Sequence, residues 1–449
     1  MDRQILIDNL IRPSQESDRP YTEKHTCGAL HQMARGLAAQ MKSTAAGEPV
    51  CLCADDRAIV VAAMLASLHT GIPLIMPHGG AAATLDGLRA EMPYRAAIVG
   101  TQADAHLPSD VTAIAADLAT ASGDDGPLDA CLTPDSPWVY LFTGGSTGQP
   151  KIWTKTPTNL LAESAYLAER FAVTPADRVL STAPPNHIYG ILYGVLMPLL
   201  GGAQVWATTP VFPHEILDRL AQFRATILVS LPVHYRSLKA QTYKAPRLRL
   251  AFSSAGPLDP ADGEAFSAAT GAPVYEIYGS TETGGIASRC RHKGETDLTP
   301  FAPVRVDIEN ERALVSSAFI SPDLPRDENN RFLLADRLEA LADGRLRLKG
   351  RSDGIVKVGG KRVDLEMVRE ALKKHKGVAD AVVFSLPGEA GRETEIVAVV
   401  EGTADAAGLR QALQRSLEPQ ALPRRIKVVG RMPILATGKY DRPTLHKMF

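Results

Sequence analysis

The sequence predicts an α/β fold: a large N-terminal domain of mostly parallel sheets with flanking helices, and a small α+β domain at the C-terminal end. Three observations support this prediction. The chain has 449 residues, more than one ordinary domain holds. Strand-like apolar runs alternate with helical patterns through the first 350 residues, and short β-like runs rich in glycine and lysine follow. We therefore expect two domains, at residues 1–350 and 351–449.

The strands predicted for the first domain are short apolar runs bounded by turn residues. They lie at residues 48–54, 72–77, 96–100, 138–143, 178–183, 203–208, 225–232, 248–255 and 272–279. The helical patterns between them include residues 55–71, 213–224 and 259–271.

The stretch at residues 179–213 holds no charged side chain apart from His187, so it is long enough to suggest a membrane span. Several prolines and glycines interrupt it, and its last part has the pattern of a strand. We therefore expect a buried helix followed by a buried strand, and no membrane span.

The second domain begins with a predicted hairpin at residues 350–363, whose turn is Gly359-Gly360. Asp364 can cap the helix predicted at residues 365–375. Two strands, a helix and a last strand follow, at residues 380–386, 395–401, 407–417 and 425–430.

Composition and charge favour a globular cytoplasmic protein. Hydrophobic residues make up 45% and charged residues 22%, and the net charge of −1 gives no general attraction to nucleic acid or acidic membranes. The N-terminus lacks the pattern of a signal peptide. The five cysteines lack zinc-site spacing and are expected to be buried reduced thiols, with Cys51 and Cys53 facing the same side of a strand.

The segment "YLFTGGSTGQPK" (140–151) places a loop of convergent donors and one cation between two predicted strands. Backbone N–H groups, hydroxyls and a lysine suit a phosphate group, although a glycine-rich loop alone fits a plain hairpin equally well. A Walker P-loop is excluded because the lysine does not open a helix. The candidate phosphate ligands are Thr143, Gly144, Gly145, Ser146, Thr147, Gly148 and Lys151.

This loop and three later segments resemble, in order, the motifs of the adenylate-forming superfamily, which includes acyl- and aryl-CoA ligases, luciferases and peptide-synthetase adenylation domains. The later segments are "YEIYGSTETGG" (275–285), "GRSDGIVKVGGKRVDLEMV" (350–368) and "MPILATGKYDR" (432–442). The chain is most similar in kind to a short acyl/aryl-CoA or acyl-carrier-protein ligase. The resemblance implies activation of an aryl or acyl carboxylate by ATP to an acyl-adenylate, with release of pyrophosphate, and then formation of a thioester.

The resemblance also implies the nucleotide ligands. Tyr278 would stack on the adenine, Thr281 would bind phosphate and Glu282 would hold Mg²⁺, roles that suit an aromatic face and a carboxylate. Asp336 and Arg351 would bind the ribose, although Leu334 and Ala335 replace the family's Thr-Gly. The remaining implied nucleotide contacts are Ala255, Gly256, Pro257, Gly279 and Ser280.

The catalytic and substrate residues are implied in the same way. Lys439 would be the catalytic lysine, and His187 would touch the carboxylate and gate the path of the thiol. The small domain would be mobile, turning about Asp353, with Gly359 and Gly360 in the thiol tunnel. The substrate pocket would include Tyr189, His234, Tyr235 and Ser254.

Several alternatives stay open. The acceptor thiol is either coenzyme A or the phosphopantetheine of an acyl carrier protein, which the basic stretches at residues 373–376 and 423–427 could dock, although such stretches are more often solvated faces. Two other hypotheses are a degenerate nucleotide- or acyl-binding protein and an unrelated phosphotransferase. The carboxylic acid and the oligomeric state, including a homodimer, cannot be read from the sequence.

Overall fold

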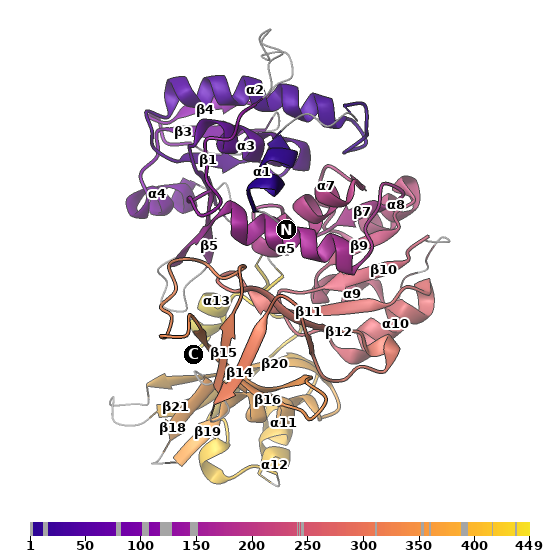
Figure 1. Cartoon of the computed structure of the whole chain (residues 1–449). Coiled ribbons are helices and arrows are strands. Elements are labelled where there is room, and N and C mark those ends of the chain that lie inside the picture. The colour runs from indigo at the N-terminus through magenta and orange to yellow at the C-terminus, as the bar shows by residue number, and fades with distance from the viewer. Residues whose placement is uncertain are drawn as a thin grey trace. The chain divides into compact units, whose positions relative to one another are not determined.

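The computed structural model describes residues 3–11, 17–77, 82–100, 107–116, 128–143, 151–239, 241, 243, 247–309, 312–351, 354–358, 361–387, 394–414, 416–435 and 438–449. These residues form two compact units, each of which is described by itself (Figure 1). The first unit is Met1–Val304 with Ser317–Pro325, and the second is Arg305–Ser316 with Arg326–Phe449. The second unit thus begins before the predicted boundary at residue 351.

The first unit contains a six-stranded sheet of order β4-β3-β1-β2-β5-β6. All neighbours are parallel except β5 and β6. Helix α3 (Arg57–Thr70) joins β1 to β2; Asp56 caps its start, and Gly71 ends it at φ +76°, a conformation that glycine adopts readily. The strands are β1 (Val50–Cys53), β2 (Leu74–Met76), β3 (Ala96–Val99), β4 (Thr112–Ala115), β5 (Val139–Thr143) and β6 (Lys151–Lys155).

A seven-stranded sheet in the same unit has the order β13-β12-β11-β10-β9-β7-β8. Its strands from β8 to β11 are parallel, so their carboxyl ends meet at one edge. The strands are β7 (Arg178–Ser181), β8 (Gln204–Val205), β9 (Ile227–Ser230), β10 (Leu250–Ser253), β11 (Val274–Ser280), β12 (Gly284–Arg289) and β13 (Thr299–Pro300). The helices connecting or flanking them are α5 (Pro157–Arg170), α8 (Pro213–Phe223), α9 (Pro232–Leu238) and α10 (Pro260–Thr270).

The uncharged stretch after β7 is a buried helical run followed by a short strand, as predicted. The run consists of α6 (Ile188–Ile191), a π-helical turn (Leu192–Leu196) and α7 (Met197–Gly201), and it leads into β8. Within the described part of the chain, every helix is too short or too polar to cross a membrane.

The second unit holds three smaller sheets. Its antiparallel four-stranded sheet contains β14 (Arg305–Glu309), β15 (Arg312–Ser316), β16 (Phe332–Ala340) and β17 (Leu346–Arg351); a hairpin, β18 (Ile355–Val358) with β19 (Lys361–Asp364), follows. The last sheet is β20 (Val378–Pro387), β21 (Thr394–Gly402) and β22 (Arg425–Val429), and its helices are α11 (Leu365–Lys373), α12 (Ala406–Leu413) and α13 (Arg442–His446). Asp364 caps α11, as predicted.

The expectation that all five thiols are buried is wrong. Cys27, Cys51 and Cys290 are buried, whereas Cys53 is half-buried and Cys131 is exposed. The sulfur atoms of Cys51 and Cys53 lie 3.5 Å apart, as expected for side chains on the same face of a strand.

Candidate functional site

Serine residues end four parallel strands at one edge of the seven-stranded sheet. Ser181, Ser230, Ser253 and Ser280 are the last residues of β7, β9, β10 and β11. Ligands of open α/β sheets bind outside the carboxyl ends of the strands, so this edge is the candidate site. The predicted nucleotide residues 255–257 and 278–281 lie on segments at or directly after these ends. So do the predicted metal ligand Glu282 and the predicted substrate residues His234 and Ser254.

The turn between β11 and β12 carries the predicted adenine, phosphate and metal ligands. Tyr278, Thr281 and Glu282 are all half-buried. The pairing of the two strands shifts register after Tyr278, and a Cβ on Gly279 would lie 2.3 Å from the carbonyl oxygen of Gly284, so only glycine fits there. The backbone conformation at Tyr278 and Gly279 is therefore closely constrained.

Two buried charged side chains contact this turn from β6 and α5. Lys155 Nζ donates to the carbonyl oxygens of Glu282 (3.2 Å) and Phe319 (3.0 Å). Glu163 Oε1 accepts from the N–H of Gly285 at 2.7 Å. Both side chains are 1% exposed. Burial lowers the pKa of Lys155 and raises the pKa of Glu163, while the opposite charge of each partially offsets this effect.

Asn159 ties the start of α5 to the segment that follows β15. Its amide nitrogen donates to the carbonyl oxygens of Ala318 (2.7 Å) and Ile320 (3.1 Å), while its backbone and side chain complete a capping box with Thr156. The N–H of Ser321 donates to the same Glu282 carbonyl that Lys155 contacts. The Glu282 carbonyl thus accepts hydrogen bonds from two segments, β6 and the segment after β15.

The turn after β10 contains a strained residue. Ala255 has φ +69°, which is uncommon for a side chain with a Cβ and is often found at functional sites. Beside it, Ser254 Oγ donates to the carbonyl of Ile277 in β11, and Gly256 and Pro257 are exposed. The hydroxyl of Ser253 is buried and has no hydrogen-bond partner among the described residues.

His234 lies buried at the start of α9, behind the strand ends. Its Nδ1 is 2.7 Å from the hydroxyl of Thr182 and 3.4 Å from that of Ser230. Burial lowers the pKa of His234 from 6.5 to about 4, so the ring is neutral at pH 7.

We expect the unfolding free energy to fall as the pH drops from 6.5 towards 4, by about 3 kcal/mol from His234 alone, because the unfolded state binds the proton first. His31, whose pKa is likewise lowered to about 4, adds to the slope. Urea titrations at several pH values should therefore show a shallower dependence for His234→Asn than for the wild type. Identical slopes would show that this ring does not titrate as described.

The tyrosines predicted for the substrate pocket are packed into the protein. Tyr189 is buried and donates to the carbonyl of Ser230, with its ring 5.1 Å from that of Tyr193. Tyr235 has no exposed surface, donates to the carbonyl of Phe252 and packs against Phe266. Both tyrosines are therefore buried and hydrogen-bonded to backbone carbonyls, and their place in the substrate pocket stays a prediction.

The segment containing His187 is fixed by an arginine clamp. Arg57, at the start of α3, is fully buried and donates to five backbone carbonyls, which belong to Ser181, Ala183, Trp206, Ala207 and Thr208. The half-buried His187 precedes α6, and its N–H donates to the carbonyl of Pro184.

In the second unit, the predicted ribose pair lies on adjacent strands. Asp336 of β16 is the direct register partner of Arg351 of β17. Lys439 is exposed in a tight turn: its carbonyl accepts from Leu435, and Gly438 N–H donates back to Leu435. The hydroxyl of Tyr440 is anchored to Asp380 in β20.

Several predicted residues cannot be placed. The loop residues Gly144, Gly145, Ser146, Thr147 and Gly148, the hinge residue Asp353 and the tunnel residues Gly359 and Gly360 lie outside the described residues, as do the side chains of Thr143 and Arg351. Lys151 is described and exposed, and it is the register partner of Thr143 across the β5–β6 pair.

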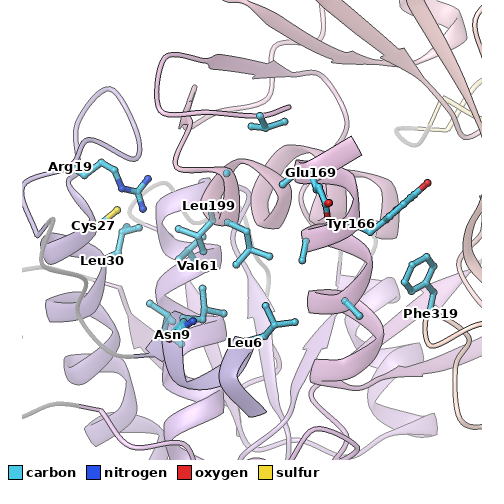
Figure 2. A pocket seen from close by; sticks show the side chains of 18 of the residues that line it. Leu6, Asn9, Arg19, Cys27, Leu30, Val61, Tyr166, Glu169, Leu199 and Phe319 are labelled. Atoms are coloured by element: carbon cyan, nitrogen blue, oxygen red, sulfur yellow. The ribbon is translucent and has the colours of Figure 1, made fainter. Parts of the chain in front are cut away.

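A pocket of about 960 Å³ in the first unit lies away from these residues (Figure 2). Its walls come from helices α1 (Arg3–Ile11), α2 (Cys27–Thr44), α3, α5 and α7. Leu6, Val61 and Leu199 give it an apolar interior, and none of the predicted site residues lines it.

The residues present fit a magnesium ion held jointly with a substrate. Within the described ranges, no three His, Cys, Asp or Glu side chains gather as a metal cluster. Glu282 supplies a single carboxylate on a tightly held turn. Mg²⁺ is commonly held by one or two carboxylates together with substrate phosphates, so one carboxylate is sufficient.

Sequence reasoning missed Lys155, Glu163, Asn159 and Arg57. The segment "KTPTN" (155–159) carries a readable helix start, since Thr156 and Asn159 have capping-box spacing and Pro157 occupies the first turn. That start would place Asn159 and Glu163 four residues apart on one helix face. Their partners, more than 100 residues away in the chain, leave no local pattern.

Comparison with known proteins places these features in context. A family model described as AMP-binding enzyme matches residues 12–315, and its C-terminal domain model matches residues 368–439. The chain is 27% identical to the sulfoacetate–CoA ligase of Cupriavidus necator over 69% of its own length and 66% of that protein's. It is 30% identical to the 4-coumarate–CoA ligase of Cereibacter sphaeroides, over 66% and 68% of the two chains. It thus matches only about two thirds of the length of these relatives.

One solved structure shows the same fold over the whole chain. The O-succinylbenzoate coenzyme A synthetase of Bacillus subtilis, in complex with ATP and magnesium, aligns with a TM-score of 0.82 at 19% identity, covering 98% of this chain and 99% of the other. The predicted α/β architecture with two parts is confirmed.

Proposed function

Because the chain belongs to the AMP-binding enzyme family, we propose that it activates an aryl or acyl carboxylate with ATP and passes the acyl group to a thiol. The observation that carries this proposal is the β11–β12 turn, which presents Tyr278, Thr281 and Glu282 at the carboxyl edge of the parallel strands. Beside it lie the strained Ala255 and the unpartnered hydroxyl of Ser253.

The proposed first step replaces a poor leaving group by a good one. A carboxylate oxygen attacks the α-phosphorus of ATP, the bond to the β-phosphate breaks, and pyrophosphate leaves. Negative charge builds up on the transferred phosphoryl group, and we propose Lys439 as the cation that stabilises it. Glu282 would hold Mg²⁺, which neutralises phosphate charge when bound.

In the proposed second step, the thiol loses its proton to solvent, its sulfur attacks the acyl carbonyl carbon, and AMP leaves. Coenzyme A is the acceptor we favour, because both relatives named above are coenzyme A ligases. Phosphopantetheine on a carrier protein is the alternative. We propose that the domain starting at residue 351 turns about Asp353 between the steps and that His187 gates the thiol.

We propose a flat aryl or medium-length acyl acid as the substrate. The test supplies the purified protein with ATP, Mg²⁺, a panel of acids and either coenzyme A or a phosphopantetheinylated carrier protein. Mass spectrometry should detect AMP and the coenzyme A thioester of one acid class. ATP binding without AMP formation for any acid would instead favour a nucleotide-binding protein without turnover.

A further inference from the structure

We propose that Lys155 and Glu163 are positioning residues that hold the β11–β12 turn in the shape needed to bind Mg²⁺·ATP; this inference rests on the proposed function. Neither residue belongs to the motifs that predicted the site. Both come from the β6–α5 segment, which follows the glycine-rich loop in the chain, and both contact the backbone of the turn.

The contacts are made to the backbone of the turn from the carbonyl of Glu282 to the N–H of Gly285. Lys155 binds the carbonyl of Glu282 itself, and Glu163 accepts from the N–H of Gly285. Lys155 also binds the carbonyl of Phe319, in the segment whose Ser321 N–H contacts Glu282. The ammonium group of Lys155 thereby links the β11–β12 turn to the segment that contains Phe319 and Ser321.

Burial makes this arrangement costly unless the hydrogen bonds are kept. Both side chains are almost fully buried, where an unpaired charge is strongly unfavourable. Gly284 adopts φ +70°, and a Cβ there would lie 2.3 Å from Glu163 Oε2, so the carboxylate packs directly against the turn backbone. Two well-packed apolar side chains at these positions could stabilise the fold as well as the charged ones do. Only side chains that donate to and accept from the turn backbone can also fix its geometry.

The test removes both charges at once, so that neither is left buried and unpaired. The variant Lys155→Met/Glu163→Gln keeps the side-chain volumes and an acceptor for Gly285, but it removes the donor to Glu282 and Phe319. We expect calorimetric titration to show Mg²⁺·ATP binding weakened by about 10- to 100-fold, the range seen when groups that orient metal ligands are lost. Binding of ATP in EDTA should change much less.

A control lies at the amino ends of β7 and β10, in the same sheet but away from the β11–β12 turn. Arg249 pairs with the buried Asp177 at 2.7 Å and also donates to the carbonyls of Phe171 and Ala172. Arg249→Met/Asp177→Asn therefore removes a second pair of opposite charges in this unit, formed by the buried Asp177 and the more exposed Arg249. It should lower the thermal stability but leave the affinity for Mg²⁺·ATP unchanged.

The outcomes separate this inference from the proposed function. Wild-type affinity for Mg²⁺·ATP in the Lys155→Met/Glu163→Gln variant, or equal weakening in the control, would overturn the positioning role. A wild type that binds Mg²⁺·ATP but activates no acid would contradict the proposed function and leave the positioning role to be judged by the binding data. A wild type that does not bind Mg²⁺·ATP would overturn both.

Discussion

Lys439→Ala should lower carboxylate-dependent adenylation by about 10²–10³-fold, the usual effect of removing one group that stabilises transition-state charge. Lys439 is exposed, its carbonyl accepts from the N–H of Leu435, and it precedes Tyr440, whose hydroxyl is anchored to Asp380. An exposed side chain on a fixed backbone has no role in core packing and can contact a bound substrate. Stability should be unchanged, because no buried group is lost.

The control and the second reaction sharpen this prediction. Lys447→Ala removes a nearby exposed lysine and should leave adenylation unchanged. Thioester formation from a chemically prepared acyl-adenylate should survive in Lys439→Ala, because the proposed role belongs to the first step. Loss of both half-reactions, or of neither, would contradict the assignment.

Gly190→Ala should destabilise the protein by about 3 kcal/mol or more, because it forces an atom into a closely packed backbone. A Cβ at Gly190 would lie 1.9 Å from the carbonyl oxygen of Pro184 and 2.6 Å from its carbonyl carbon. That oxygen accepts the N–H of His187, so relief of the clash must displace the segment that we propose to gate the thiol. Urea unfolding measures the stability, and thioester formation measures the effect on the site.

Gly87→Ala is the matched control. Gly87 lies in helix α4 (Ala82–Glu91), and no atom lies within 4 Å of a Cβ built there. The substitution should stabilise the protein by about 0.5–1 kcal/mol, since alanine loses less backbone entropy than glycine in a helix. Similar unfolding free energies for Gly190→Ala and the wild type would contradict the prediction, because they would show that the backbone at Pro184 moves aside at little cost.

The parallel strands could be predicted from the sequence because they are buried on both faces and read as continuous apolar runs, for example "ATILVSLP" in β9. The sheet formed by β14–β17 was missed. Its strands are half exposed, and charged residues such as Arg305, Asp307 and Glu309 interrupt the apolar pattern. Strand pairing across a sheet, rather than any local run, holds these segments in place.

In the candidate site, too, residues that are adjacent in the sequence were predicted, whereas residues whose partners lie far away in the chain were not. Tyr278, Thr281 and Glu282 were predicted because they are adjacent in one motif, and the structure places them together on one turn. Tyr235 was predicted from its position in a motif-like segment, and that segment gives no sign that its hydroxyl binds the carbonyl of Phe252 or that its ring packs against Phe266. Lys155 and Glu163 were missed because the turn they contact lies 127 and 122 residues away in the chain.

Carboxylate-dependent exchange of pyrophosphate into ATP tests the central claim most directly. The assay needs no acceptor thiol, so it isolates adenylate formation from the choice between coenzyme A and a carrier protein. The account predicts exchange with one class of aryl or acyl acids and none without an acid. Binding of Mg²⁺·ATP without exchange for any acid in a broad panel would contradict it.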